Sequence, residues 1–156
     1  MTEIVRPVFT RLKTVDETVN NSAVLQDDND FQFEAVASST YLVEIYLLLT
    51  NSSIIADWQA TWVLPSGTFS WGPLASNSTG LGSWEAVSTT LTPVSGVPTG
   101  VISFGGGNTS FLVRCTAIMV IGVTGGTVKF QWAQNTAQAE NNTVKAGSIL
   151  TYVKVN

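Results

Sequence analysis

The amino-acid sequence predicts an all-β protein, a sandwich or a barrel. Apolar residues nowhere keep the spacing of three and four residues that marks an amphipathic helix. Short alternating or β-branched segments recur instead, and turn residues separate them about every eight to twelve residues. The chain of 156 residues has the length of one domain and is long enough to bury a core.

The first predicted strands alternate clearly. Residues 31–36, FQFEAV, place apolar side chains on one face, and residues 40–49, TYLVEIYLLL, form a long strand that is apolar on both faces. Residues 57–64, DWQATWVL, read as a half-buried strand that ends at a Pro-Ser-Gly turn. Trp58 and Trp62 share one face of this strand, so we expect them in the core rather than stacked on a sugar.

The rest of the chain holds further predicted strands, at residues 68–74, 84–91, 100–104, 110–123, 128–134 and 148–155. Gly125 and Gly126 lie between two of these segments, and both can take the positive φ angles of a tight turn. The sequence therefore predicts a β-hairpin from Val113 to Trp132. Trp71 and Trp84 flank a loop, and we expect them to close one end of the sandwich.

The two long strands, residues 40–49 and 110–123, are each apolar on both faces and each carry one charge near the middle, Glu44 and Arg114. A two-sheet sandwich buries only one face of each sheet, so the second apolar face needs another cover. We expect Glu44 and Arg114 in or beside a contact between subunits, paired with each other. The alternative is that each charge lies at the solvent edge of its strand.

Charged residues make up only 12% of the chain, and its mean hydropathy is positive. The apolar runs are too short to cross a bilayer, so oligomerisation or partner binding explains this composition better than a membrane. The net charge of −4 argues against nucleic acid as a partner. No signal-peptide pattern opens the chain, so we do not expect export by that route.

The first thirteen residues differ from the rest and are predicted to form an arm, with residues 14–156 as the folded domain. Cationic residues concentrate there beside apolar ones, and Pro7 discourages regular pairing. Two interpretations are open, an arm that docks on another protein and a frayed terminus. The expected docking residues are Ile4, Val5, Arg6, Pro7, Val8, Phe9 and Arg11.

Common catalytic arrangements are excluded because the chain has no histidine and no nucleophile-elbow, phosphate-loop or dinucleotide motif. We therefore expect no enzymatic activity, no cofactor and no metal. The single Cys115 is expected to be buried and inert. Asp27, Asp28 and Asp30 are similar to part of a calcium loop but lack its glycine and distal glutamate, so a solvated turn is the favoured interpretation.

Two stretches carry a resemblance to a known family. Residues 132–155, WAQNTAQAENNTVKAGSILTYVKV, and residues 18–47, TVNNSAVLQDDNDFQFEAVASSTYLVEIYL, are similar to the closing and opening segments of a family of virion accessory proteins of tailed phages. With the tryptophan strand and the Pro-Ser-Gly turn between them, the resemblance spans residues 13 to 155. It implies a jelly-roll β-sandwich of the tumour-necrosis-factor type that assembles as a trimer.

The same resemblance implies a place in the virion. The short arm without a fibrous region favours a capsid decoration protein, which binds the major capsid protein on the capsid surface. The alternative is a minor tail or receptor-binding module that recognises a host glycan through the loops at residues 75–83 and 105–110. Trp132 is expected next to a threefold axis or a neighbouring subunit, with Gln131, Gln134 and Asn135 bonding across that contact, or else in the core of its own chain.

Overall fold

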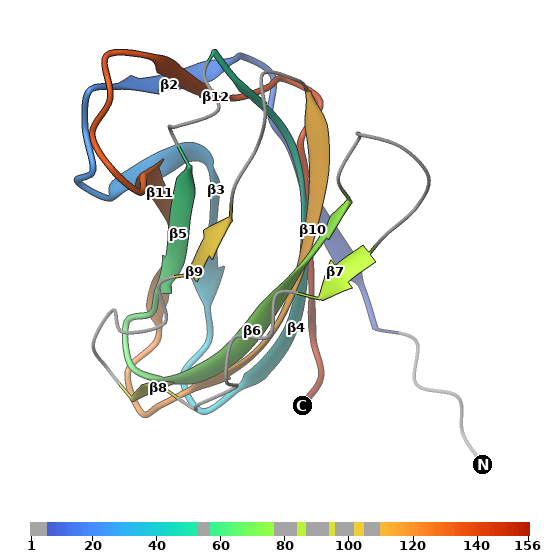
Figure 1. Cartoon of the computed structure of the whole chain (residues 1–156). Coiled ribbons are helices and arrows are strands. Elements are labelled where there is room, and N and C mark those ends of the chain that lie inside the picture. Colours follow the sequence, from blue (N-terminus) through green and yellow to red (C-terminus); the bar gives the residue numbers. More distant parts are fainter. Residues whose placement is uncertain (1–5, 53–56, 77–83, 87–93, 96–101, 105–109) are drawn as a thin grey trace.

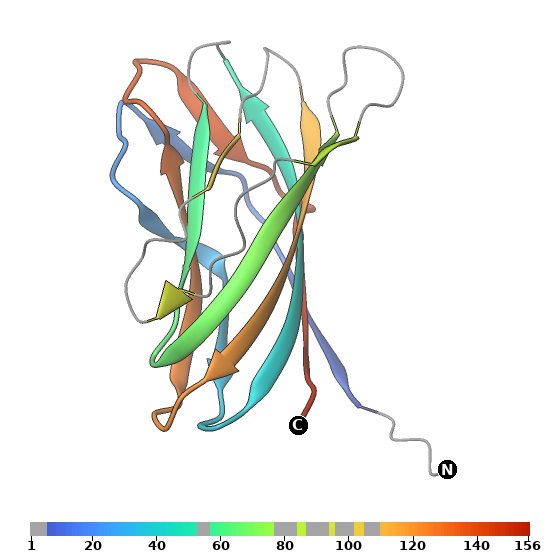
Figure 2. The same cartoon turned by 60° about the horizontal axis from the view of Figure 1, so that its bottom comes forward.

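The computed structural model describes residues 6–52, 57–76, 84–86, 94–95, 102–104 and 110–156, and every structural statement below concerns these residues. They form antiparallel β-strands and contain no helix. Two sheets stand as separate layers (Figure 1), and the turned view keeps them apart (Figure 2). The all-β prediction is therefore confirmed.

The larger sheet runs in the order β1-β13-β4-β10-β6-β7. Its strands are β1 (Val8–Leu12), β13 (Ile149–Lys154), β4 (Thr40–Asn51), β10 (Phe111–Ile121), β6 (Gly67–Ser76) and β7 (Trp84–Ala86). Three short strands join its path: β12 (Asn141–Val144) pairs with β4 and with β2 (Glu17–Asn20), and β8 (Val94–Ser95) pairs with β6.

The smaller sheet runs in the order β3-β11-β5-β9. Its strands are β3 (Gln26–Ala35), β11 (Gly126–Gln134), β5 (Trp58–Val63) and β9 (Ile102–Phe104). The chain alternates between the sheets so that β1-β13-β4-β10 faces β3-β11-β5-β9. This order, in which the first and last strands are neighbours, is the jelly-roll arrangement.

The core lies between the two sheets because each strand turns its apolar alternation inward. Phe31, Phe33, Trp58 and Trp62 are buried as the sequence predicts. Across from them, the inward residues of β4 and β10 are all buried: Tyr41, Val43, Ile45, Leu47, Leu49, Val113, Cys115, Ala117, Met119 and Ile121. Trp71 joins this core, where its ring meets Trp62 edge-on at 6.4 Å, instead of closing one end of the sandwich.

The predicted hairpin from Val113 to Trp132 is wrong. Strand β10 pairs with β4 and β6 in the larger sheet, whereas β11 pairs with β3 and β5 in the smaller one. The glycine turn instead carries the chain from one sheet to the other. A Cβ on Gly125 would lie 2.7 Å from the Ala35 carbonyl oxygen, so close packing against the end of β3 explains a glycine there.

Residues 8–12 of the predicted arm form a strand, β1, which pairs with β13 from Val8↔Val153 to Leu12↔Ile149. The boundary expected after residue 13 is therefore corrected: the sheet begins at Val8. Pro7 does not prevent this pairing because it precedes the first paired residue. The described residues contain no helix that could span a membrane.

Candidate functional site

The outer face of the larger sheet carries an exposed apolar surface. The antiparallel register aligns Val8, Val153, Leu42 and Ile118 in one row across β1, β13, β4 and β10. Leu12, Ile149 and Tyr46 form a parallel row, and Leu48 pairs with Leu112 beyond it. The exposed members of this outer apolar face are Val8, Leu12, Leu42, Leu48, Leu112, Ile118 and Val120, between 39% and 66%. The described chain leaves this face uncovered, as the two-sided apolar pattern predicts.

A polar row separates the two apolar rows. Thr10, Thr151, Glu44 and Thr116 lie side by side on the outer face, and the row ends at Gly72 of β6. A Cβ added to Gly72 would meet nothing within 4 Å, so the surface there is flat and open. The outer apolar face is therefore divided by a narrow row of polar residues, the polar seam.

Glu44 and Arg114 form the ion pair that the sequence predicts. The Arg114 Nη2 lies 2.5 Å from Glu44 Oε1, and the Tyr46 hydroxyl donates to Glu44 Oε2 at 3.0 Å. The Arg114 guanidinium also lies over the Tyr46 ring, 5.5 Å from its centre. The side chains of Arg114 and Glu44 are 40% and 29% exposed, so one chain alone leaves the pair open to solvent.

These contacts change the pKa values of Glu44, Tyr46 and Arg114. The hydrogen bond from Arg114 lowers the pKa of Glu44 below its ordinary value, and the bond from Tyr46 adds to the effect. The same pairing raises the pKa of Arg114, and the bond to Glu44 raises the pKa of the Tyr46 hydroxyl. Glu44 therefore stays ionised and paired at neutral pH.

Trp132 lies in the core of its own chain and not at a surface. It is 1% exposed, packs on Trp58 at 5.1 Å between ring centres, and donates its indole N–H to the buried Asp28 carboxylate at 3.1 Å. The core alternative for Trp132 is therefore the correct one. The physical reason is that β11 is an inner strand of its sheet, covered on one face by the other sheet.

The amides on either side of Trp132, Gln131, Gln134 and Asn135, have hydrogen bonds within their own chain. Gln131 donates to Asp27 at 2.7 Å. Gln134 is fully buried, donates to the Glu140 carbonyl at 2.7 Å and accepts from the backbone N–H of Ser22 and of Gln138. Asn135 is exposed and its backbone N–H donates to the Asp57 carbonyl. These hydrogen bonds hold loops of the same chain together.

A buried ion cluster surrounds Lys13, a residue that sequence reasoning did not single out. The Lys13 ammonium lies 2.7 Å from Glu17, 3.0 Å from both oxygens of Asp28 and 3.5 Å from Asp30. Lys13 is 1% exposed. One feature of the sequence could have indicated this cluster. Lys13 is one of few cationic residues and is followed by Asp16, Glu17 and the aspartate segment, whose carboxylates need a positive partner if they are buried.

The aspartate segment is therefore part of β3 and of this cluster, and the solvated-turn interpretation is wrong. Asp28 also accepts backbone bonds from Asp30 and Phe31. The cation next to Asp28 and Asp30 is the Lys13 ammonium, and no metal-binding group of acidic or cysteine residues occurs in the described parts of the chain. Asp27 points elsewhere and pairs with Lys129 at 2.6 Å.

Opposing effects act on the pKa of Lys13. Burial alone would lower it, but the hydrogen bonds to Glu17 and Asp28 and their charges together raise it above the ordinary value. The backbone of Lys13 bonds to Ser148 and Gly147, in the loop before β13. Lys13 thus connects the end of β1 to β2, β3 and the last loop.

Of the predicted docking residues, Ile4 and Val5 lie outside the described residues, whereas the remaining five are exposed. The Arg6 guanidinium donates to the Lys154 carbonyl at 3.2 Å, and the Phe9 ring stacks on Tyr152 at 5.2 Å. The Trp84 side chain and most of the two loops proposed for glycan contact also lie outside the described residues. Cys115 is buried as expected, and this burial raises the pKa of its thiol.

No family model and no curated protein matches this sequence. The crystal structure of the Yersinia pseudotuberculosis-derived mitogen is similar over 83% of this chain and 87% of its own, with 8% identity and a TM-score of 0.34. The infectious bursal disease virus VP2 subviral particle is similar over 95% of this chain, with 11% identity and a TM-score of 0.31. This chain spans only 40% of that VP2 chain. TM-scores this low carry no argument about function.

Proposed function

We propose that this chain is a structural protein of a virion, a capsid decoration protein that assembles as a trimer and binds the major capsid protein of a tailed phage. The family resemblance motivates the virion role. The observation that carries assembly is the outer apolar face, since it gathers seven exposed large apolar side chains on one side of one sheet. The role is mechanical and needs no catalytic group.

In this proposal the outer apolar face is covered in the trimer. Leu42, Ile118 and Val120 would be buried against a neighbouring subunit, and the Glu44–Arg114 pair would lie in or beside the same contact. Burial of apolar surface contributes roughly 25 cal/mol per Å², which is the main driving force for such association. The polar seam would set the orientation of the subunits. Its Glu44 pairs with Arg114 of the neighbouring row, and this ion pair tolerates only a partner that leaves it hydrated or hydrogen-bonded.

The decoration role follows from linkage. A protein that binds only the assembled lattice stabilises that lattice in proportion to its binding free energy. Three copies of the N-terminal segment on one trimer would bind the capsid with much greater avidity than one segment. The residues before Val8, among them Arg6 and Pro7, are the proposed capsid contact.

The first test measures assembly. Ile118→Glu places a charge on a side chain that is 54% exposed, so the fold should tolerate it while the proposed subunit contact should not. Val123→Glu, at a position that is 89% exposed in the turn after β10, is the matched control. Sedimentation equilibrium should give trimers or multiples of trimers for the parent chain and Val123→Glu, but a monomer or a dimer for Ile118→Glu. An unchanged mass for Ile118→Glu would reject this face as the contact.

The second test measures the capsid role. Heads of the phage that encodes the chain, stripped of accessory proteins, are pelleted with the full chain and with a variant lacking residues 2–6. Removing all thirteen residues would also delete Lys13 and leave Asp28 without its cation, so the shorter deletion is the cleaner variant. Pelleting of the full chain alone supports the proposal. If neither protein pellets, the tail module is tested next, by glycan binding.

A further inference from the structure

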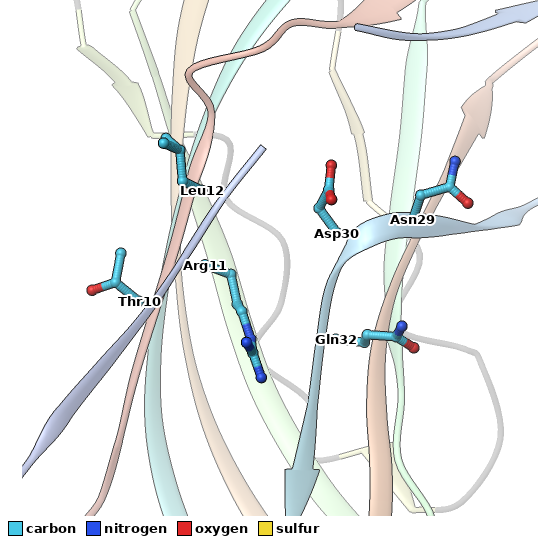
Figure 3. A pocket seen from close by; sticks show the side chains of 6 residues that line it. All are labelled: Thr10, Arg11, Leu12, Asn29, Asp30 and Gln32. Atoms are coloured by element: carbon cyan, nitrogen blue, oxygen red, sulfur yellow. The ribbon is translucent and has the colours of Figure 1, made fainter. Parts of the chain in front are cut away.

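Strand β1 has an open edge. Its only partner among the described strands is β13, and all five of its residues, Val8 to Leu12, are exposed. A cavity of about 460 Å³ lies beside it, lined by residues of β1 and β3 and shown in Figure 3. Natural edge strands are commonly protected by charged side chains, proline or bulges. Between its ends β1 has no lysine, proline or bulge, and its one charged residue is Arg11. No described strand pairs with this edge.

The backbone bonds of Lys13 indicate which residues face this edge. The Lys13 N–H donates to the Ser148 carbonyl, and its carbonyl accepts from Gly147, so Lys13 faces β13. In an antiparallel sheet, alternate residues direct both backbone groups to the same neighbour. Phe9 and Arg11 therefore face β13 as well. Val8, Thr10 and Leu12 direct their N–H and carbonyl groups to the open edge.

A second hydrogen bond, at the other end of β13, leads independently to the same assignment of which β1 residues face β13. The Val155 N–H donates to the Thr40 carbonyl, which places the odd-numbered residues of β13 toward β4. The even-numbered residues of β13 then face β1, and Tyr152 and Leu150 are the register partners of Phe9 and Arg11. Both hydrogen bonds therefore indicate that Val8, Thr10 and Leu12 direct their backbone groups to the open edge.

We propose that two copies of this chain pair edge to edge through β1, antiparallel, about a twofold axis at Thr10. In this register Val8 stands opposite Leu12 of the second copy, and Thr10 stands opposite its own equivalent. The N–H and carbonyl groups that Val8, Thr10 and Leu12 direct outward can then form hydrogen bonds with the same groups of the second copy. A twofold contact of this kind needs a self-complementary surface, which this strand provides.

The side chains fit the same register. Phe9 stands opposite Arg11 of the second copy, and an arginine over an aromatic ring is a favourable pair. Arg11 makes no side-chain hydrogen bond to any described residue, so it is free to do this. Figure 3 shows Arg11 on the side of β1 that faces β3, with Thr10 on the opposite side. Val8 and Leu12 pair on the outer apolar face and extend it into the second copy.

Neighbouring registers are worse. A shift by one residue sets outward groups against groups already bonded to β13, so the ladder cannot form. A shift by two residues in one direction places Arg11 opposite Arg11 of the second copy, a repulsion of like charges. A shift in the other direction pairs Val8 with Thr10 of the second copy and leaves Leu12 opposite Arg6, which lies outside the strand. The register centred on Thr10 is the one that uses the full strand.

This pairing goes beyond the proposed attachment to the capsid, because the partner is a second copy and the contact is measurable without capsids. In a decorated shell it would join one trimer to the next, while the residues before Val8 remain for the capsid protein. It does not depend on the outer apolar face. The two contacts can therefore fail separately.

A cysteine at the axis tests the pairing directly. Opposite residues in a hydrogen-bonded pair have Cα atoms about 5.5 Å apart, which a disulfide can span. Thr10→Cys should therefore form a covalent dimer under mild oxidation, whereas Val123→Cys, exposed at the far turn, should not at the same concentration. The native Cys115 is buried and does not compete. Equal crosslinking of both variants, or none for Thr10→Cys, overturns the proposal.

Thr10→Pro is the complementary test. Its N–H faces the open edge, so proline there removes a bond to the second copy but none to β13. In the Ile118→Glu background, which removes association through the outer face, this variant should weaken dimerisation at least about tenfold in sedimentation equilibrium. Its circular dichroism and melting should match those of the parent. Unchanged dimerisation with a folded chain would contradict the inference.

Discussion

At the scale of single residues, Lys13 shows how one buried cation organises several elements. Its ammonium lies among three carboxylates from β2 and β3. Such a cluster is expensive to bury and is tolerated because every charge has a close opposite. The Trp132 indole N–H donates a further hydrogen bond to the Asp28 carboxylate. The cluster therefore links the N-terminal strand to the core.

Removal of this cation should destabilise the fold. Lys13→Met keeps the length of the side chain but leaves Asp28 buried without its cation, and the expected cost is about 3–5 kcal/mol in the free energy of unfolding. Lys145→Met is the matched control, since Lys145 pairs with Asp16 at the surface, where solvent screens the pair, and its loss should change stability far less. Urea titrations of both variants measure these energies. Equal costs would show that the cluster contributes no more than a surface pair.

The Glu44–Arg114 pair should be visible in the pH dependence of stability. Because Arg114 lowers the pKa of Glu44 in the folded chain, the pair stabilises the fold above the ordinary pKa of 4.5. That contribution is lost as the pH falls through the lowered pKa. Arg114→Gln should therefore reduce the urea midpoint near pH 7, and the difference from the parent should shrink below about pH 4. A difference that is constant with pH would exclude this linkage.

At the scale of elements, the strands with clear alternation were predictable and the polar ones were not. The burial of Phe31, Phe33 and Trp58 follows from period-two patterns that a single strand already displays. The short strands β2 and β12 were missed because ETVN and NNTV lack such a pattern. They are strands because they pair with each other and, through β12, with β4.

Two glycines of β6 should respond differently to the same substitution. Gly67 has φ of +107°, and a Cβ there would lie 2.0 Å from the Val120 carbonyl oxygen. Gly67→Ala should cost about 1–3 kcal/mol from backbone strain alone, with the clash in addition. Gly72 has open space around its Cβ position, so Gly72→Ala should change the melting temperature little. Thermal unfolding of both variants compares them, and similar melting temperatures would contradict the assigned geometry at Gly67.

At the scale of the whole molecule, the sandwich buries one face of each sheet and leaves the outer face of the larger sheet apolar. This is why a chain with only 12% charged residues fits an assembling protein better than a monomer. The outer face and the open edge of β1 are adjacent, since Val8 and Leu12 belong to both. One region of the molecule therefore carries both proposed contacts between copies.

The rate at which the buried Cys115 reacts with a thiol reagent can be used to measure global unfolding. Cys115 is 1% exposed in the middle of β10, and burial raises its pKa, so the folded state presents neither access nor thiolate. Reaction with a thiol reagent should therefore require global opening, and its rate should increase in Lys13→Met in step with the loss of stability. Fast labelling of the native chain, unaffected by that substitution, would show that β10 opens locally.

The sequence by itself determined the all-β class, the buried face of most long strands and the surplus apolar face, because these are properties of local periodicity and composition. The Glu44–Arg114 pairing was also predictable, from two charges placed within apolar strands. Only the tertiary structure decided that β10 and β11 belong to different sheets, that Trp132 is a core residue and that Lys13 neutralises the aspartates. Such features depend on which distant strands pair and in what register, and an alternating pattern in one strand is compatible with many partners.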